Sequence, residues 1–278
     1  MQSSSSGDHA RRALSAVLVA VAGVAAGTVA TAQAQSSLPG SSVTGGAAPR
    51  CVVALDPGHN GEDTDEFDPV TGVRMIDYPN GGEDADALEI TRAVESRLAL
   101  AGIGTEVVKT SVDEDVTYRE RVDRASGAGA FMGVSVHTTP GADQSAVFPQ
   151  RQGAYRAGTD GAGGHRTVSF DNPGVAAESQ RLSGVVAGAR SVLEGGEVPV
   201  RDNSFAGRDP LWEGNIPVIS LIADMPWIYN EFGSATGGGA EGLTGAEKAR
   251  YINGLSAGLI AAAATSPACT GVGLSGAS

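Results

Sequence analysis

The chain has 278 residues, 32 of them acidic and 19 basic, for a formal net charge of −13. An acidic chain of this size is long enough for one large domain or two small ones. It repels phosphate groups, which disfavours nucleic acid as a partner.

The first 34 residues show the three-part pattern of a secretory signal peptide. An arginine pair precedes an Ala/Val-rich run over residues 13–30, and an Ala-x-Ala sequence ends at Ala34. We predict a signal peptide over residues 1–34, cleaved before Gln35. The apolar run has the length of a membrane anchor, but its Ala/Gly-rich composition favours cleavage. The mature protein is then exported, secreted or cell-wall associated, with no membrane attachment; the route of export stays open.

Residues 35–50 are rich in Ser, Gly and Pro, which predicts a flexible linker. We expect one folded domain over residues 51–270 and a short tail over residues 271–278. Cys51 and Cys269 stand at the two borders of that domain. In an exported protein such a pair favours a disulfide between the ends; the alternative is two free thiols, because the spacing matches no metal motif.

The first strand is the apolar run over residues 52–55. It is followed by Asp56 and stopped by a Pro-Gly turn, which leaves His59 at its carboxyl end. Ligand sites of open α/β sheets collect at such ends. The histidine is therefore a metal ligand, an acid/base group or a hydrogen-bonded turn residue.

The chain then alternates between helical and strand patterns. Acid-rich residues 62–84 predict a long loop. A helix over residues 87–101 follows, with Asp86 as its N-cap, and then a strand over residues 105–110. Thr117 and Glu120 form a capping box for a helix over residues 117–128. A strand over residues 131–136 ends at His137.

The second half has one long irregular stretch and two clear helices. Residues 140–172 predict a Gly-rich loop with a short strand at 153–155. Apolar spacing predicts a helix over residues 175–193, and short strands are expected at 198–200 and 218–223. Thr244 and Glu247 cap a last helix over residues 245–264.

This alternation predicts an α/β fold: a single domain whose twisted, mostly parallel sheet is covered by helices on both faces. Parallel neighbours would bring polar residues that follow three strands to one edge of the sheet. They are Asp56 with His59, His137, and Asp224.

Two histidines and a carboxylate at one edge favour a catalytic zinc site, because zinc in hydrolases takes three nitrogen or oxygen ligands and activates a water. Taken alone, His59 and His137 are weak signals, since each fits a turn or core histidine as well. Asp56 is placed either to accept a hydrogen bond from a ligand histidine or to form the turn before proline.

Four motifs in order resemble the zinc-dependent N-acetylmuramoyl-L-alanine amidases of the amidase 3 type. They are Leu-Asp-Pro-Gly-His-Asn-Gly at residues 55–61, Glu89 near a helix start, Arg119-Glu120-Arg121, and Ser135-Val136-His137. The resemblance covers residues 52–264. It implies an α/β catalytic domain that binds one Zn²⁺ through His59, Glu89 and His137.

Glu89 has a competing interpretation, because with Asp86 it has the spacing of a capping box. Glu83 and Asp84 are the substitutes if the register differs. The family's general base is a glutamate four residues after a proline; counting from Pro217 places Ile222 there.

Isoleucine cannot act as a base, so the sequence leaves Asp224 as first candidate and Glu231 as second. The resemblance implies a peptidoglycan or muropeptide substrate, cut between N-acetylmuramic acid and L-alanine, and we expect a monomer. The alternatives are a catalytically inactive amidase-like domain that binds wall fragments or regulates a partner, and a zinc peptidase.

Overall fold

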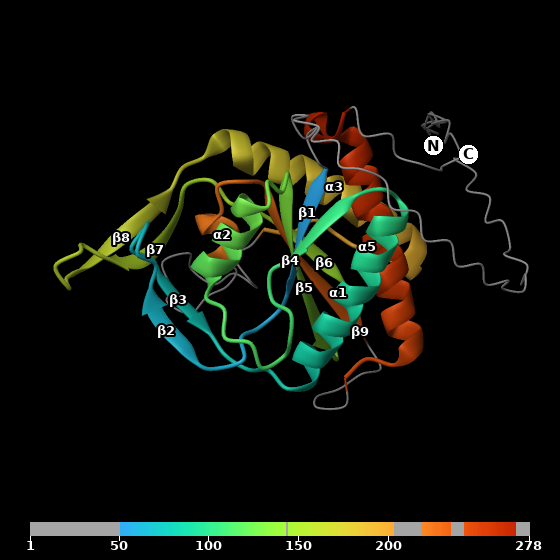
Figure 1. Cartoon of the computed structure of the whole chain (residues 1–278), viewed down its shortest axis with the longest axis horizontal. Coiled ribbons are helices and arrows are strands. Elements are labelled where there is room, and N and C mark those ends of the chain that lie inside the picture. The colour runs from blue at the N-terminus through green and yellow to red at the C-terminus, as the bar shows by residue number, and fades with distance from the viewer. Residues whose placement is uncertain (1–50, 143, 203–217, 235–241, 271–278) are drawn as a thin grey trace, which may run out of the picture. The chain divides into compact units, whose positions relative to one another are not determined.

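A five-stranded sheet forms the centre of the fold (Figure 1). Its strands, in order across the sheet, are β4 (Gly104–Val107), β1 (Val52–Pro57), β5 (Met132–Pro140), β9 (Trp227–Ser234) and β6 (Ala146–Pro149). The first four run parallel, and β6 is antiparallel to β9. This confirms the predicted mostly parallel sheet.

The computed structural model describes residues 51–142, 144–202, 218–234 and 242–270. The predicted signal peptide, linker and tail lie outside these residues. Among the described helices, none combines the length and apolar character that crossing a bilayer requires.

Helices cover both faces of the sheet, as predicted. On one face lie α1 (Gly82–Leu100), α3 (Pro173–Glu194) and α5 (Gly245–Thr265), whose apolar side chains share a core with Val134 and Val136 of β5. On the other lie α2 (Tyr118–Gly127) and the short α4 (Val218–Ile222), packed with Trp227 (Figure 1). Any side chain at Gly133 would collide with the Trp227 indole, so glycine lets this ring lie flat across the sheet.

The predicted helix ends agree with the structure where a capping motif marks them. Thr117 with Glu120 begins α2 and Thr244 with Glu247 begins α5, each as a complete capping box. Gly195 ends α3 in the left-handed conformation, at a φ of 80°. These boundaries depend on local hydrogen bonds, which sequence patterns report directly.

The two stretches predicted as loops contain β-hairpins, so the loop predictions were wrong; of them, only the short strand expected at 153–155 coincides with a strand of the structure. One hairpin joins β2 (Thr64–Phe67) to β3 (Arg74–Asp77), and the other joins β7 (Ala154–Thr159) to β8 (His165–Phe170). A bridge between Val73 and Gly158 links them. The buried apolar residues of the hairpins pack on the α2 side of the sheet. In the sequence, many acidic and glycine residues hide the alternation of apolar and polar residues that is typical of strands.

Three further predictions need correction. α1 begins at Gly82 rather than residue 87, so Asp86 is not its N-cap: it is buried, accepts a hydrogen bond from the Leu243 amide at 2.6 Å and pairs with Lys248 at 2.7 Å. The expected strand at residues 218–223 is instead α4, because a run buried on all sides has no periodicity that separates helix from strand. Of the expected strand at 198–200, the structure has only an isolated bridge from Val200 to Val147.

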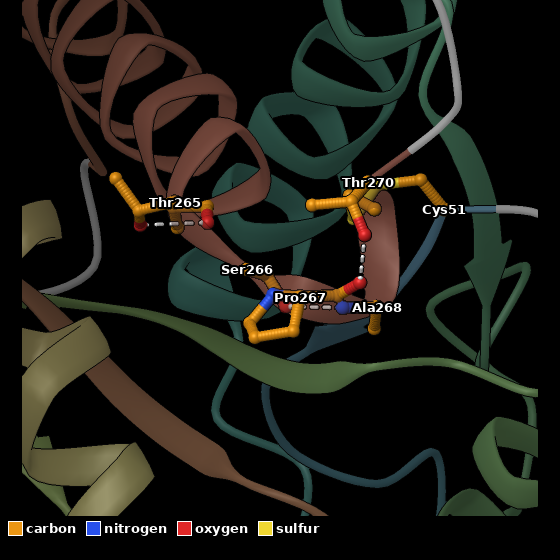
Figure 2. The surroundings of a disulfide bond; sticks show 8 residues. Cys51, Thr265, Ser266, Pro267, Ala268 and Thr270 are labelled. Carbon is orange, nitrogen blue, oxygen red and sulfur yellow. Dashed lines mark hydrogen bonds between the residues drawn. A yellow bond between two sulfur atoms is a disulfide. The ribbon is translucent and has the colours of Figure 1, made fainter.

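The predicted disulfide between Cys51 and Cys269 is present and joins residues 218 positions apart (Figure 2). Cys269 ends a 3-10 turn, η2 (Pro267–Cys269), that follows α5. The Ser266 hydroxyl accepts from the Ala268 amide, and Thr270 donates to the Pro267 carbonyl at 2.6 Å. The bond therefore connects the start of β1 to the end of the last helix.

Replacing both cysteines with alanine should lower the free energy of unfolding by about 2–4 kcal/mol, because the unfolded chain regains the freedom that the cross-link removes. Urea unfolding of the oxidised protein and of the variant measures the difference. Wild-type protein under reducing conditions serves as control and should show a similar loss. Equal stability of all three would contradict a stabilising role.

Candidate metal centre

His59 stands in a strained turn at the carboxyl end of β1. Its backbone has a φ of 62°, the only positive value among described residues other than glycine. Such a conformation costs energy and persists where surrounding contacts fix it. Here the Gly58 amide donates to the Val136 carbonyl at 2.9 Å, and the His59 carbonyl accepts from Arg121 Nη2 at 2.8 Å. The strain turns the imidazole towards β5.

His137 lies on β5, directly beyond that turn. Its ring centroid is 4.8 Å from that of His59, in an edge-on arrangement, and it stacks on the Tyr229 ring at 4.2 Å. A Cβ at position 58 would collide with the His137 imidazole. The glycine of the turn is therefore required for the two histidines to approach each other.

Glu83, in the first turn of α1, completes the cluster. Its Oε2 lies 3.2 Å from His59 Nε2, and its Oε1 lies 3.1 Å from His137 Nδ1. The Thr138 amide donates to the same Oε1 at 2.9 Å and fixes the carboxylate. The potential ligand atoms of the three residues all lie within 4.8 Å of one another. This group could hold a metal ion.

The electrostatics of the cluster favour positive charge. Burial lowers the pKa of His59, but hydrogen bonds to Asp77 and Glu83 outweigh it and raise the pKa to about 10. Burial raises the pKa of Glu83, and its bonds to the two histidines overcome this and hold the value far below the usual range. Two carboxylates thus surround one imidazole, a donor set that suits a divalent cation.

A buried arginine supports the cluster from behind. Arg121 of α2 is 1% exposed; it pairs with Asp56 at 3.0 Å and with Asp77 at 3.1 Å, besides its bond to the His59 carbonyl. Asp77 in turn lies 3.7 Å from His59 Nδ1. The guanidinium therefore holds both the turn and the carboxylate that faces the back of the imidazole.

The structure places Asp56 differently from the prediction. Its carboxylate bonds Arg121 and accepts from Ser135 Oγ at 2.7 Å, so it acts on His59 only through the arginine. Asp77 faces the imidazole instead. Sequence reasoning missed Asp77 because it ends a hairpin strand that had been predicted as loop.

Glu89 does not lie with the histidines. Its side chain is 63% exposed and binds Lys248 at 2.5 Å. A glutamate in the first turn of this helix does reach the strand ends, but Glu89 is not in that turn, because α1 begins five residues earlier than predicted. Glu83, named as a substitute, is the carboxylate that the structure brings to the cluster.

The two candidates for a general base differ in their place along β9: Asp224 lies three residues before the strand, and Glu231 lies within it. Asp224 precedes the strand and accepts from Ser126 Oγ at 2.9 Å, far from the histidines along the sheet. Glu231 pairs with His137 in the register of β5 and β9, and its Oε2 accepts from Thr139 at 2.6 Å. Pro226, directly before the strand, is the sequence signal that marks its true start.

Glu231 and both histidines line one pocket of about 280 Å³. Burial, with the negative charge of Glu83 adding to it, raises the pKa of Glu231. The pocket is lined by His59, Tyr78, Asn80, Glu83, His137, Thr138, Thr139, Tyr229 and Glu231. The candidate metal ligands and the Glu231 carboxylate therefore share this pocket, with Glu231 directly beside His137 in the sheet.

No protein-family model and no curated protein matches the chain. Among solved structures it is similar to the apo N-acetylmuramyl-L-alanine amidase of Mycobacterium abscessus, with a TM-score of 0.51 and 16% identity over 76% of this chain and 98% of that one. It is also similar to the N-acetylmuramoyl-L-alanine amidase of Clostridium difficile 630, with a TM-score of 0.48, 16% identity and coverage of 77% and 96%. The Mycobacterium abscessus likeness shows that the chain has this fold.

Replacing Arg121 with methionine should lower the free energy of unfolding by about 3–5 kcal/mol, because Asp56 and Asp77 would stay buried without their partner. Arg124→Met on the same helix is the matched control. Its guanidinium is 40% exposed, pairs with Glu114 and donates to the Val108 carbonyl at 2.7 Å, so its loss should cost only about 1–2 kcal/mol. Chemical unfolding measures both, and similar losses would contradict the special role of Arg121.

Proposed function

We propose that the protein is a zinc-dependent peptidoglycan amidase that hydrolyses the amide bond between N-acetylmuramic acid and the L-alanine of the stem peptide. The observation that carries this proposal is the convergence of His59, Glu83 and His137 on one pocket that also holds Glu231. The fold shared with an N-acetylmuramyl-L-alanine amidase and the motif at residues 55–61 support the choice of substrate.

The residues of the cluster fit a catalytic zinc ion. Two imidazoles and one carboxylate are a ligand set that zinc hydrolases use, and Asp77 behind His59 is the kind of partner that orients a ligand histidine. When bound, zinc would polarise the amide carbonyl and activate water.

Glu231 is the general base in this proposal. It would accept a proton from the attacking water and then donate it to the leaving amine of the stem peptide. A raised pKa suits a group that must both take and release a proton near neutral pH. The Thr139 hydroxyl keeps the carboxylate turned to the pocket.

We extend the proposal to an exported, monomeric enzyme that acts at the cell wall. The disulfide between Cys51 and Cys269 is of the kind that persists in oxidising compartments, which supports export. The acidic net charge and the polar pocket are compatible with a wall fragment as substrate.

The metal-binding part is tested by zinc analysis of the purified protein. We expect about one zinc per chain, with loss of tight binding in His59→Ala, His137→Ala and Glu83→Gln, because each removes a ligand. Glu89→Gln is the matched control from the same helix and should retain zinc. Retention by both histidine variants would refute this centre.

The catalytic part is tested with muropeptides and mass spectrometry, which detects free stem peptides that begin with L-alanine. Glu231→Gln should lower kcat by about 10²–10⁴-fold, since it removes the base but keeps the size of the side chain. Asp224→Asn, a change before the start of β9 at a carboxylate that bonds Ser126, should keep wild-type activity. Binding of muropeptides without release by the wild-type protein would identify an inactive wall-binding domain instead.

A further inference from the structure

Asn80 lies at the mouth of the pocket, between β3 and α1. Its backbone amide donates to Asp84 Oδ2 at 2.7 Å, which anchors the segment that precedes the helix. The side chain is thereby held beside Glu83, although the residue itself is exposed. Neither the predicted ligand set nor the proposed chemistry uses this residue.

The amide group of Asn80 faces two of the candidate ligand atoms at once. Its Nδ2 lies 3.2 Å from His59 Nε2 and 2.6 Å from Glu83 Oε2. These two atoms are themselves 3.2 Å apart. A cation held by both would therefore lie next to the terminal amide of Asn80.

The chemistry of the amide decides which end of it suits that position. The NH₂ group only donates hydrogen bonds, and it would face a positive charge unfavourably once the lone pairs of His59 and Glu83 are engaged by a cation. A half-turn of the amide exchanges Nδ2 for Oδ1, an oxygen with two lone pairs, at almost no change in shape. Side-chain amide oxygens are established ligands of Ca²⁺, and zinc also accepts oxygen ligands beside nitrogen.

We propose that Asn80 is an additional metal ligand of this centre, through Oδ1, beside His59, Glu83 and His137. Because catalytic zinc can expand to five ligands, the water of the proposed reaction keeps a place. This inference rests on the proposed zinc site and extends it. It makes the segment between β3 and α1 part of the metal centre, and a cation would then tie the hairpin, the helix and both histidine strands together.

Two variants at this position test the inference by metal binding rather than by activity. Asn80→Leu has nearly the same shape but no oxygen, and should raise the Kd for zinc at least about tenfold. Asn80→Asp keeps an oxygen at the same place and should bind at least as tightly as the wild type. Competition with a chromophoric chelator measures the affinities, and thermal unfolding of the metal-free proteins checks that all of them fold.

Cobalt(II) in place of zinc provides a second readout, because its visible absorption depends on the number and kind of ligands. The Asn80→Leu spectrum should differ from that of the wild type, whereas Tyr78→Phe, a pocket residue two positions away, should leave it unchanged. An unchanged Asn80→Leu spectrum overturns the inference, even if affinity falls, because Asn80 would then act only by orienting Glu83. If His59→Ala also retains zinc, the whole proposed centre fails; if only the Asn80 variants do, the centre stands without this ligand.

Discussion

The buried guanidinium of Arg121 is the interaction on which the site depends. It neutralises Asp56 and Asp77 in the interior and donates to the carbonyls of His59 and Val116. An arginine without these partners, or the carboxylates without the arginine, would carry an uncompensated buried charge. The arrangement connects α2, β1 and the β2–β3 hairpin. Although α2 supplies no candidate metal ligand, it fixes the turn that carries His59.

Around this support the sheet brings the reactive groups together by register. β5 lies between β1 and β9, and the pairing of His137 with Glu231 sets the proposed base beside one histidine, while the turn after β1 brings in the other. Glu83 reaches the same edge from the start of α1. Burial raises the pKa of Glu231, and the negative charge of Glu83 adds to this effect. The same negative charge at this edge favours the cation that the proposed function requires.

Several features follow from local patterns and were predictable. The strands β1 and β5 and the capping boxes at Thr117 and Thr244 depend on neighbours within a few residues. The mostly parallel sheet follows from the alternation of strands and helices. The disulfide was predictable because Cys51 and Cys269 are the only cysteines and stand at the borders of the domain. The hairpins were missed because each is stabilised by packing on the α2 side rather than by its own sequence.

The sequence by itself thus determined the fold class and the two histidines, since each follows an apolar strand at a point where the chain must turn. Only the tertiary structure decided which carboxylates join them. Glu83 rather than Glu89 depends on where α1 begins, and Glu231 rather than Asp224 depends on whether residues 218–223 form a strand or a helix. A displacement of a few residues along a helix or strand moves a carboxylate to another face or another end of the sheet, and packing alone fixes that displacement.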